Sequence, residues 1–84
     1  MKQNEEIMTI LQEECAEVIQ AVSKVKRFGM SENHTNLIKE LCDLQCMIDL
    51  MYEYHVIHCS MEDKLNYIFD KRQKLKKYSR IFNV

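Results

Sequence analysis

The sequence contains no proline and a single glycine, Gly29, in 84 residues. Proline interrupts helices and glycine weakens them, so a chain almost free of both can continue a helix wherever one has begun. We therefore expect an all-α fold. The shortage of glycine also excludes Walker A and dinucleotide-binding loops, whose backbone must approach phosphate closely. Any phosphate chemistry has to use side chains and metal ions.

Three helices are predicted, over residues 4–28, 35–55 and 60–78. Gly29 suits the left-handed residue that closes the first helix. The connector "MSENHTN" offers Ser, Asn and Thr as N-caps for the second helix, and Ser60 with Asp63 forms a capping pair for the third. We expect one domain, residues 1–84. Because a chain this short buries only a modest core, we also expect help from a partner subunit or a bound ion.

The charge balance excludes some classes of partner. Twelve Lys and Arg residues oppose 13 Asp and Glu, and the net charge of -1 argues against a nucleic-acid coat or a membrane-surface peptide. No apolar run is long enough to span a bilayer, and "MKQNEEIMTI" lacks the apolar region of a signal peptide. We expect a cytoplasmic protein.

The cysteines and aromatic residues are interpreted first as core residues. The sequence has no C-x-x-C pair, and isolated cysteines in a reducing compartment mostly behave as small buried apolar residues. The alternative is a zinc site in which Cys42 and Cys46 join His55 or His58. Aromatic side chains are candidates for stacking on a base, but we favour the core for each of them. The residues concerned are Cys15, Cys42, Cys46 and Cys59, and Phe28, Tyr52, Tyr54, Tyr67, Phe69 and Tyr78.

Two pairs of acidic residues disturb the apolar stripes of the first two predicted helices. In the first, "LQEECAEVIQAV" (residues 11–22) places Glu14 beside the stripe, with Glu17 on the same side and Glu13 at its boundary. In the second, Glu40 and Asp43 project toward a packed flank rather than the polar back. The stripes comprise Ile7, Leu11, Val18, Val22 and Val25 in the first helix and Leu37, Leu41, Leu44, Ile48 and Met51 in the second.

Four carboxylates directed between two helices repel one another, and desolvation adds to the free energy of ionising them. A bound cation removes this conflict, and oxygen ligands suit Mg²⁺ or Mn²⁺. The absence of an E-x-x-H step argues against a di-iron centre. The alternative is that these are ordinary surface glutamates paired with Lys24 or Lys39.

The acidic residues match a known family signature. "EECAE", residues 13–17, is followed after 22 intervening residues by "ELCD", residues 40–43. This order resembles the EExxE and ExxD motifs of the MazG-like, all-α nucleoside triphosphate pyrophosphohydrolases. The likeness continues through "SKVKRFG" and the lysine-rich third helix ending in "KKYS". It implies an antiparallel helical bundle completed by oligomerisation, as a dimer or a dimer of dimers, and hydrolysis of (d)NTP to (d)NMP and pyrophosphate.

The resemblance also assigns roles to residues. Glu14, Glu17, Glu40 and Asp43 would hold Mg²⁺, with Mn²⁺ as a substitute, and Glu13 would help bind a second ion or position water. A metal-bound or carboxylate-positioned water would attack the α-phosphate. The candidate substrate-binding residues are Lys26, Arg27, Lys71, Lys74, Lys77 and Tyr78.

Other interpretations stay open at this stage. The basic residues also suit helix dipoles and solubility. The alternative function is a non-catalytic helical dimerisation protein that binds nucleotide or metal without turnover, and a weaker one is a basic third helix contacting nucleic acid. The preferred base and sugar, and the number of metal ions, do not follow from the sequence.

Overall fold

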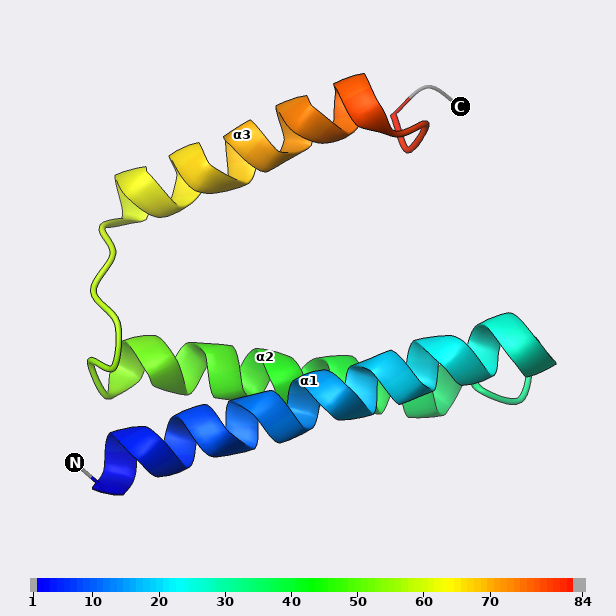
Figure 1. The fold of residues 1–84 in the computed structure, drawn as a ribbon, viewed down its shortest axis with the longest axis horizontal. Helices are drawn as coiled ribbons and strands as arrows, with labels where there is room; N and C mark the ends of the chain where they lie inside the picture. Colours follow the sequence, from blue (N-terminus) through cyan, green and yellow to red (C-terminus); the bar gives the residue numbers. More distant parts are fainter. Residues whose placement is uncertain (1, 83–84) are drawn as a thin grey trace.

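The computed structural model describes residues 2–82, which form an all-α fold of three helices. They are α1 (Lys2–Phe28), α2 (His34–Glu53) and α3 (Met61–Tyr78), as Figure 1 shows. The predicted helical class and the order of the helices are confirmed. Within residues 2–82, no helix is long and apolar enough to cross a membrane.

The helix ends follow local sequence signals, with one exception. Gly29 is left-handed at φ +93°, and its N–H donates to the carbonyl of Val25 over 2.8 Å. The Ser60 hydroxyl accepts a hydrogen bond from the N–H of Asp63 over 3.0 Å, so the predicted cap of α3 is confirmed. For α2, one of the predicted N-cap residues takes the cap position, but without a capping side-chain hydrogen bond. Asn33 occupies the N-cap position, but its amide instead donates to the Gly29 carbonyl over 2.9 Å and tightens the α1–α2 connector.

Gly29→Ala is expected to lower the free energy of unfolding by about 1 kcal/mol, because a side chain disfavours the left-handed conformation. No atom lies within 4 Å of the position a Cβ would take, so steric overlap adds nothing. Gly29→Asn is the matched control, since Asn tolerates this conformation better and should lose less. Urea unfolding at a fixed protein concentration tests the difference. Equal stability of the Ala variant and the parent would contradict this account of the turn.

The first two helices pack antiparallel and form a hairpin around a narrow core. Residues at seven-residue intervals line the seam, a spacing that keeps one side of each helix facing the other. The buried apolar side chains among the described residues are Ile7, Ala21 and Met47. The half-buried seam residues include Leu11, Val18 and Val25 of α1 and Leu37, Leu44 and Met51 of α2.

The third helix stands apart from this hairpin. Within the described residues the backbone of α3 does not pack against α1 or α2, and Figure 1 shows this helix separated from them. Its start is held by the ammonium of Lys64, which lies 4.9 Å from the ring centroid of Tyr52. The predicted antiparallel packing is therefore found for α1 and α2, whereas a three-helix bundle is not formed within one chain.

The detached third helix explains why the core predictions fail for many side chains. Tyr67, Phe69 and Tyr78 are exposed on α3 because no other helix covers them. Phe28 and Tyr54 are exposed at or beyond the ends of the hairpin helices. Cys15, Cys42 and Cys46 are also exposed, and only Cys59 is half-buried. Core burial of these residues was the wrong expectation for a single chain.

Candidate metal centre

The seam of the hairpin carries two carboxylates where apolar residues are expected. Glu14 lies seven residues from both Ile7 and Ala21, and Glu40 lies seven residues from Met47. Ile7, Ala21 and Met47 are buried, so the same helical rows direct Glu14 and Glu40 toward the opposite helix. Asp43 follows Glu40 by about one turn and flanks the seam. Both helices thus present carboxylates at the contact between them.

The structure brings three of these carboxylates together. Glu14, Glu40 and Asp43 are half-buried, and one oxygen of each lies within 4.8 Å of the others. Oxygen ligands on opposite sides of a cation are separated by about twice the metal–oxygen distance, roughly 4–5 Å for Mg²⁺ and Ca²⁺. We call these three residues the acidic cluster. Its spacing and its oxygen donors fit a single hard divalent cation.

The charges around Glu14 in the acidic cluster are all negative. Burial raises the pKa of Glu14 above its ordinary value, and repulsion from Asp43, Glu40, Glu17 and Glu13 raises it further. All the charged neighbours responsible for this pKa shift are carboxylates. The alternative that Glu14 is a surface residue neutralised by Lys24 or Lys39 is therefore not supported. A divalent ion would supply the missing positive charge.

The other two motif acids lie at the rim. Glu17 and Glu13 are exposed on α1 and do not belong to the three-residue cluster, although both raise the pKa of Glu14. Glu17 follows Glu14 by three residues, so it projects about 60° around the helix from it. The structure therefore gathers three of the four predicted metal ligands and leaves the fourth beside them.

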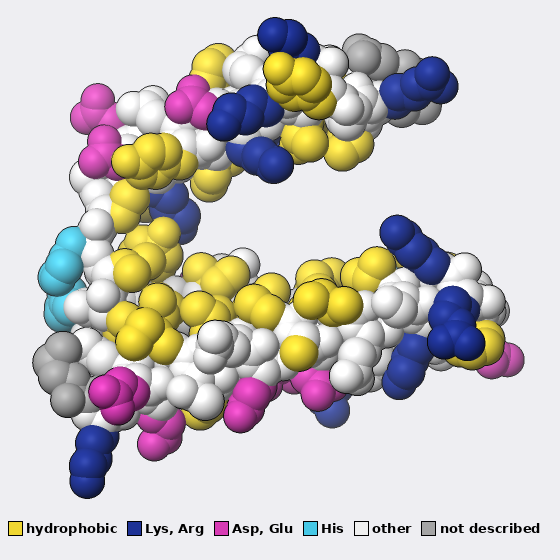
Figure 2. All heavy atoms as spheres, viewed as in Figure 1, with side chains coloured by type: hydrophobic (Ala, Val, Ile, Leu, Met, Phe, Trp, Pro, Cys, Tyr) yellow, Lys and Arg dark blue, Asp and Glu magenta, His cyan; other side chains and the backbone are white. Residues whose placement is uncertain are grey.

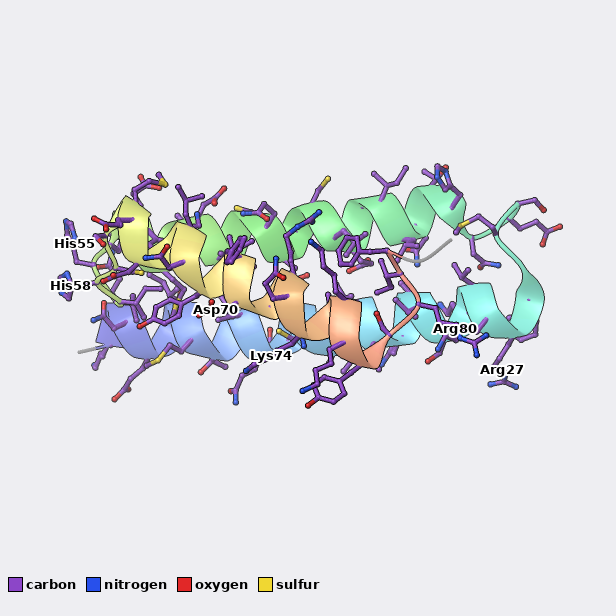
Figure 3. The ribbon with its side chains drawn as sticks, turned by 90° about the horizontal axis from the view of Figure 1, so that it is seen from above. Arg27, His55, His58, Asp70, Lys74 and Arg80 are labelled. Atoms are coloured by element: carbon purple, nitrogen blue, oxygen red, sulfur yellow. The ribbon has the colours of Figure 1, made fainter. Side chains whose placement is uncertain are left out.

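The candidate substrate-binding residues are not gathered at the acidic cluster within one chain. Arg27 lies about 15 Å along the helix axis from Glu17. The Arg27 guanidinium sits 5.2 Å from the ring centroid of Phe28, and its side chain points outward at the end of α1 (Figure 3). Lys26 belongs to the same last turn.

The basic residues of α3 lie on one side of the hairpin, and the acidic side chains of α1 lie on the other. Figure 2 shows acidic side chains along the side of α1 that faces away from α3. Lys71, Lys74, Lys77 and Tyr78 belong to α3, where the Lys77 ammonium lies 5.4 Å from the Tyr78 ring centroid. Because the backbone of α3 does not pack along its own hairpin, a binding role for these residues remains a proposal.

Sequence reasoning treated His55 and His58 only as possible zinc ligands. In the structure their rings stack, with centroids 5.7 Å apart and planes 14° from parallel. His55 is left-handed at φ 55°, a conformation that the sequence did not signal. Within residues 2–82, no group of three or more ligand-type side chains includes a cysteine, so the zinc alternative finds no support there.

Comparison with known proteins supplies the family. The model of the MazG nucleotide pyrophosphohydrolase domain matches residues 2–78, which include all three helices and the acidic cluster. Comparisons with curated proteins and with solved structures found no match. The family match therefore carries the assignment. Since it spans most of the 84 residues, the chain belongs to the MazG nucleotide pyrophosphohydrolase domain family.

Proposed function

We propose that this protein hydrolyses a nucleoside or deoxynucleoside triphosphate to the monophosphate and pyrophosphate, with Mg²⁺ as its ion and Mn²⁺ as a substitute. One observation carries the proposal. Carboxylates from two different helices of a MazG domain converge to within 4.8 Å, and their charge is not neutralised by lysine or arginine at Glu14. Aiming that much negative charge at a helix seam destabilises the fold unless a cation binds there.

The proposed role of each acidic residue follows from its position. Glu14, Glu40 and Asp43 would hold the ion, and Glu17, exposed beside them on α1, would be a further ligand. When bound, the ion neutralises phosphate charge and polarises the phosphorus centre. Glu13, beside Glu14, orients a water molecule whose oxygen bonds to the α-phosphorus while the bond to the bridging oxygen breaks. Pyrophosphate leaves, and the water proton passes to solvent.

Cations from the remaining candidates bind the polyphosphate chain in this proposal. Lys26 and Arg27 close α1, and the lysines of α3 form the larger basic group. Ammonium and guanidinium groups bind phosphate oxygens through charge-assisted hydrogen bonds. The single chain leaves these groups apart from the acidic cluster, so we propose that the working form is a homodimer or a dimer of dimers.

A product analysis tests this function. The full chain, free of contaminating pyrophosphatase, is incubated with a panel of NTPs and dNTPs and Mg²⁺, and the products are separated by anion exchange. We expect equal amounts of monophosphate and pyrophosphate from at least one nucleotide, and complete loss of turnover with EDTA. Release of diphosphate and phosphate would contradict the proposed bond cleavage. No turnover with any nucleotide would favour a protein that binds metal or nucleotide without catalysis.

A further inference from the structure

Two exposed cysteines of α2 have no part in the proposed function. Cys42 and Cys46 are separated by about one helical turn, and both thiols are free and exposed. Cysteine is among the residue types that are most often buried, because its side chain behaves as a small apolar group. Core packing therefore does not account for two exposed thiols on one side of a helix. We call Cys42 and Cys46 the thiol pair.

A shallow hollow in the surface of α2 contains the thiol pair. The hollow has a volume of about 420 Å³, and both cysteines line it together with Asp49 and Glu53. Gln45 also lines it, and the side-chain amide of Gln45 donates a hydrogen bond to the Asp49 carboxylate over 2.9 Å. The hollow thus combines two sulfur ligands with two negatively charged groups, which attract a cation.

The thiol pair is separate from the acidic cluster. Met47, which is buried against α1, lies about 140° around the helix from Cys42, so the thiol pair is on the outward side of α2. Asp43 lies about 60° around the helix from Cys46 and belongs to the cluster between the two helices. The cluster offers oxygen ligands only, whereas the outward hollow offers sulfur. The two sites therefore differ in the kind of ion that they fit.

The spacing of the thiol pair fits a bridging ion better than a disulfide. Side chains four residues apart on a helix have Cβ atoms about 5–6 Å apart, whereas a disulfide requires about 3.5–4.5 Å. A metal ion between two thiolates, with metal–sulfur distances of about 2.3 Å, separates the sulfur atoms by up to roughly 4.6 Å. Rotation about the Cα–Cβ bonds lets the two sulfurs reach this separation while α2 stays helical. A disulfide would have to distort the helix.

The number of ligands narrows the choice of ion. Thiolate ligands select Cu(I) and Zn²⁺ among the common metals, and structural Zn²⁺ takes four ligands. Within residues 2–82, neither Cys42 nor Cys46 belongs to a group of three converging ligand side chains. A soft Cu(I) ion is satisfied by two thiolates in a line. Two sulfurs and no third converging ligand thus fit Cu(I) and not Zn²⁺.

We infer that the thiol pair is a binding site for one Cu(I) ion per chain, held through both sulfur atoms. Each thiol releases its proton as its bond to copper forms, and the oxidation state of the metal does not change. The carboxylates of Asp49 and Glu53 add a favourable electrostatic field but are not ligands. This inference goes beyond the proposed function and does not depend on it.

Competition with a coloured Cu(I) chelator, bathocuproine disulfonate, tests the site. The full chain is titrated without oxygen, with ascorbate as reductant, and one Cu(I) per chain is expected. Cys42→Ser and Cys46→Ser should each lower the affinity by more than about 100-fold, since even outer-shell partners of a metal contribute about 10–100-fold. Cys15→Ser, which removes an exposed thiol from α1, is the matched control and should bind like the parent. A parent that takes no copper from the chelator, or a Cys46→Ser variant that binds like the parent, would overturn the proposal.

Two further measurements locate the ion. Glu40→Gln should bind Cu(I) with the affinity of the parent, because Glu40 belongs to the acidic cluster. Loss of copper binding in this variant would place the ion in that cluster and overturn the proposal. X-ray absorption should show two sulfur neighbours around copper, and light scattering should show no change of mass when Cu(I) is added. A rise in mass, with one copper per two chains, would mean that single thiols of two chains share the ion, which would also overturn the proposal.

Discussion

Glu40→Gln is expected to lower pyrophosphohydrolase activity by about 100-fold or more, because it removes one anionic ligand of the acidic cluster from the ion that binds the phosphate. The carboxylate of Glu40 lies within 4.8 Å of both Glu14 and Asp43, so the amide replaces a charge at the centre of the cluster. Initial rates at saturating Mg²⁺ and nucleotide measure the loss. Glu53→Gln, an exposed change on the same helix, is the matched control and should leave the rate unchanged.

The same variant separates catalysis from folding. Without metal, neutralising Glu40 removes repulsion from Glu14 and Asp43, so the metal-free variant should unfold at the same temperature as the parent or a higher one. Circular dichroism in EDTA gives this comparison. A variant that retains activity within a few-fold of the parent would remove Glu40 from the metal site. A variant that simply unfolds would show the carboxylate acting as a structural group.

Saturating Mg²⁺ is expected to raise the thermal midpoint by about 10–20 °C. At 100 times its dissociation constant, a ligand that binds only the folded state adds about 2.7 kcal/mol, and 1 kcal/mol shifts the midpoint of a domain this size by about 4–8 °C. Glu14→Gln should show a much smaller shift, since it removes a ligand. Scanning calorimetry with and without Mg²⁺ measures both. An equal Mg²⁺ shift in parent and variant would place the ion elsewhere.

The stabilisation by Mg²⁺ should also grow with pH. The pKa of Glu14 is raised in the folded state, so the folded metal-free protein holds this proton more tightly than the unfolded chain. The resulting stability is fully present below the ordinary pKa of Glu and is lost as the pH rises through the raised value. Above that pH, the ionised cluster repels itself and also binds cations best. A Mg²⁺ effect that falls as the pH rises across this window would contradict the assignment.

The helices were predictable because local chemistry sets them. The lack of proline allows long helices, Gly29 marks where α1 ends, and Ser60 caps α3 as its sequence suggests. The cap of α2 was not predictable, because Asn33 has two competing backbone partners and the connector geometry chooses Gly29. Local helix propensity does not predict which backbone group such a side chain will bond.

The acidic cluster was predictable for a related reason. Glu14 and Glu40 lie outside the polar side of their helices. When two antiparallel helices form a hairpin, carboxylates placed in this way meet at the contact between the helices. Glu17 was grouped with them by its spacing, but the rotation of about 60° between residues three apart leaves it at the rim. The spacing of residues in the sequence shows which of them share a side of a helix. How deeply a side chain is buried between α1 and α2 depends on how the opposite helix packs.

The position of α3 was not predictable from the sequence. The apolar residues of α3 indicate that this helix packs against another surface. They do not indicate whether that surface belongs to the same chain or to another. Ile68 and Phe69 stay 48% and 58% exposed because, within the described residues, no other helix packs along α3. The acids and the lysines of the proposed site therefore lie on separate parts of one chain.

Mn²⁺ can reveal the metal centre itself, because the anomalous scattering of this ion gives its position in a crystal of the 84-residue chain. We expect a single strong anomalous peak between α1 and α2, with carboxylate oxygens of Glu14, Glu40 and Asp43 as ligands. A crystal saturated with Mn²⁺ that shows no peak there, with the three carboxylates turned apart into solvent, would contradict it.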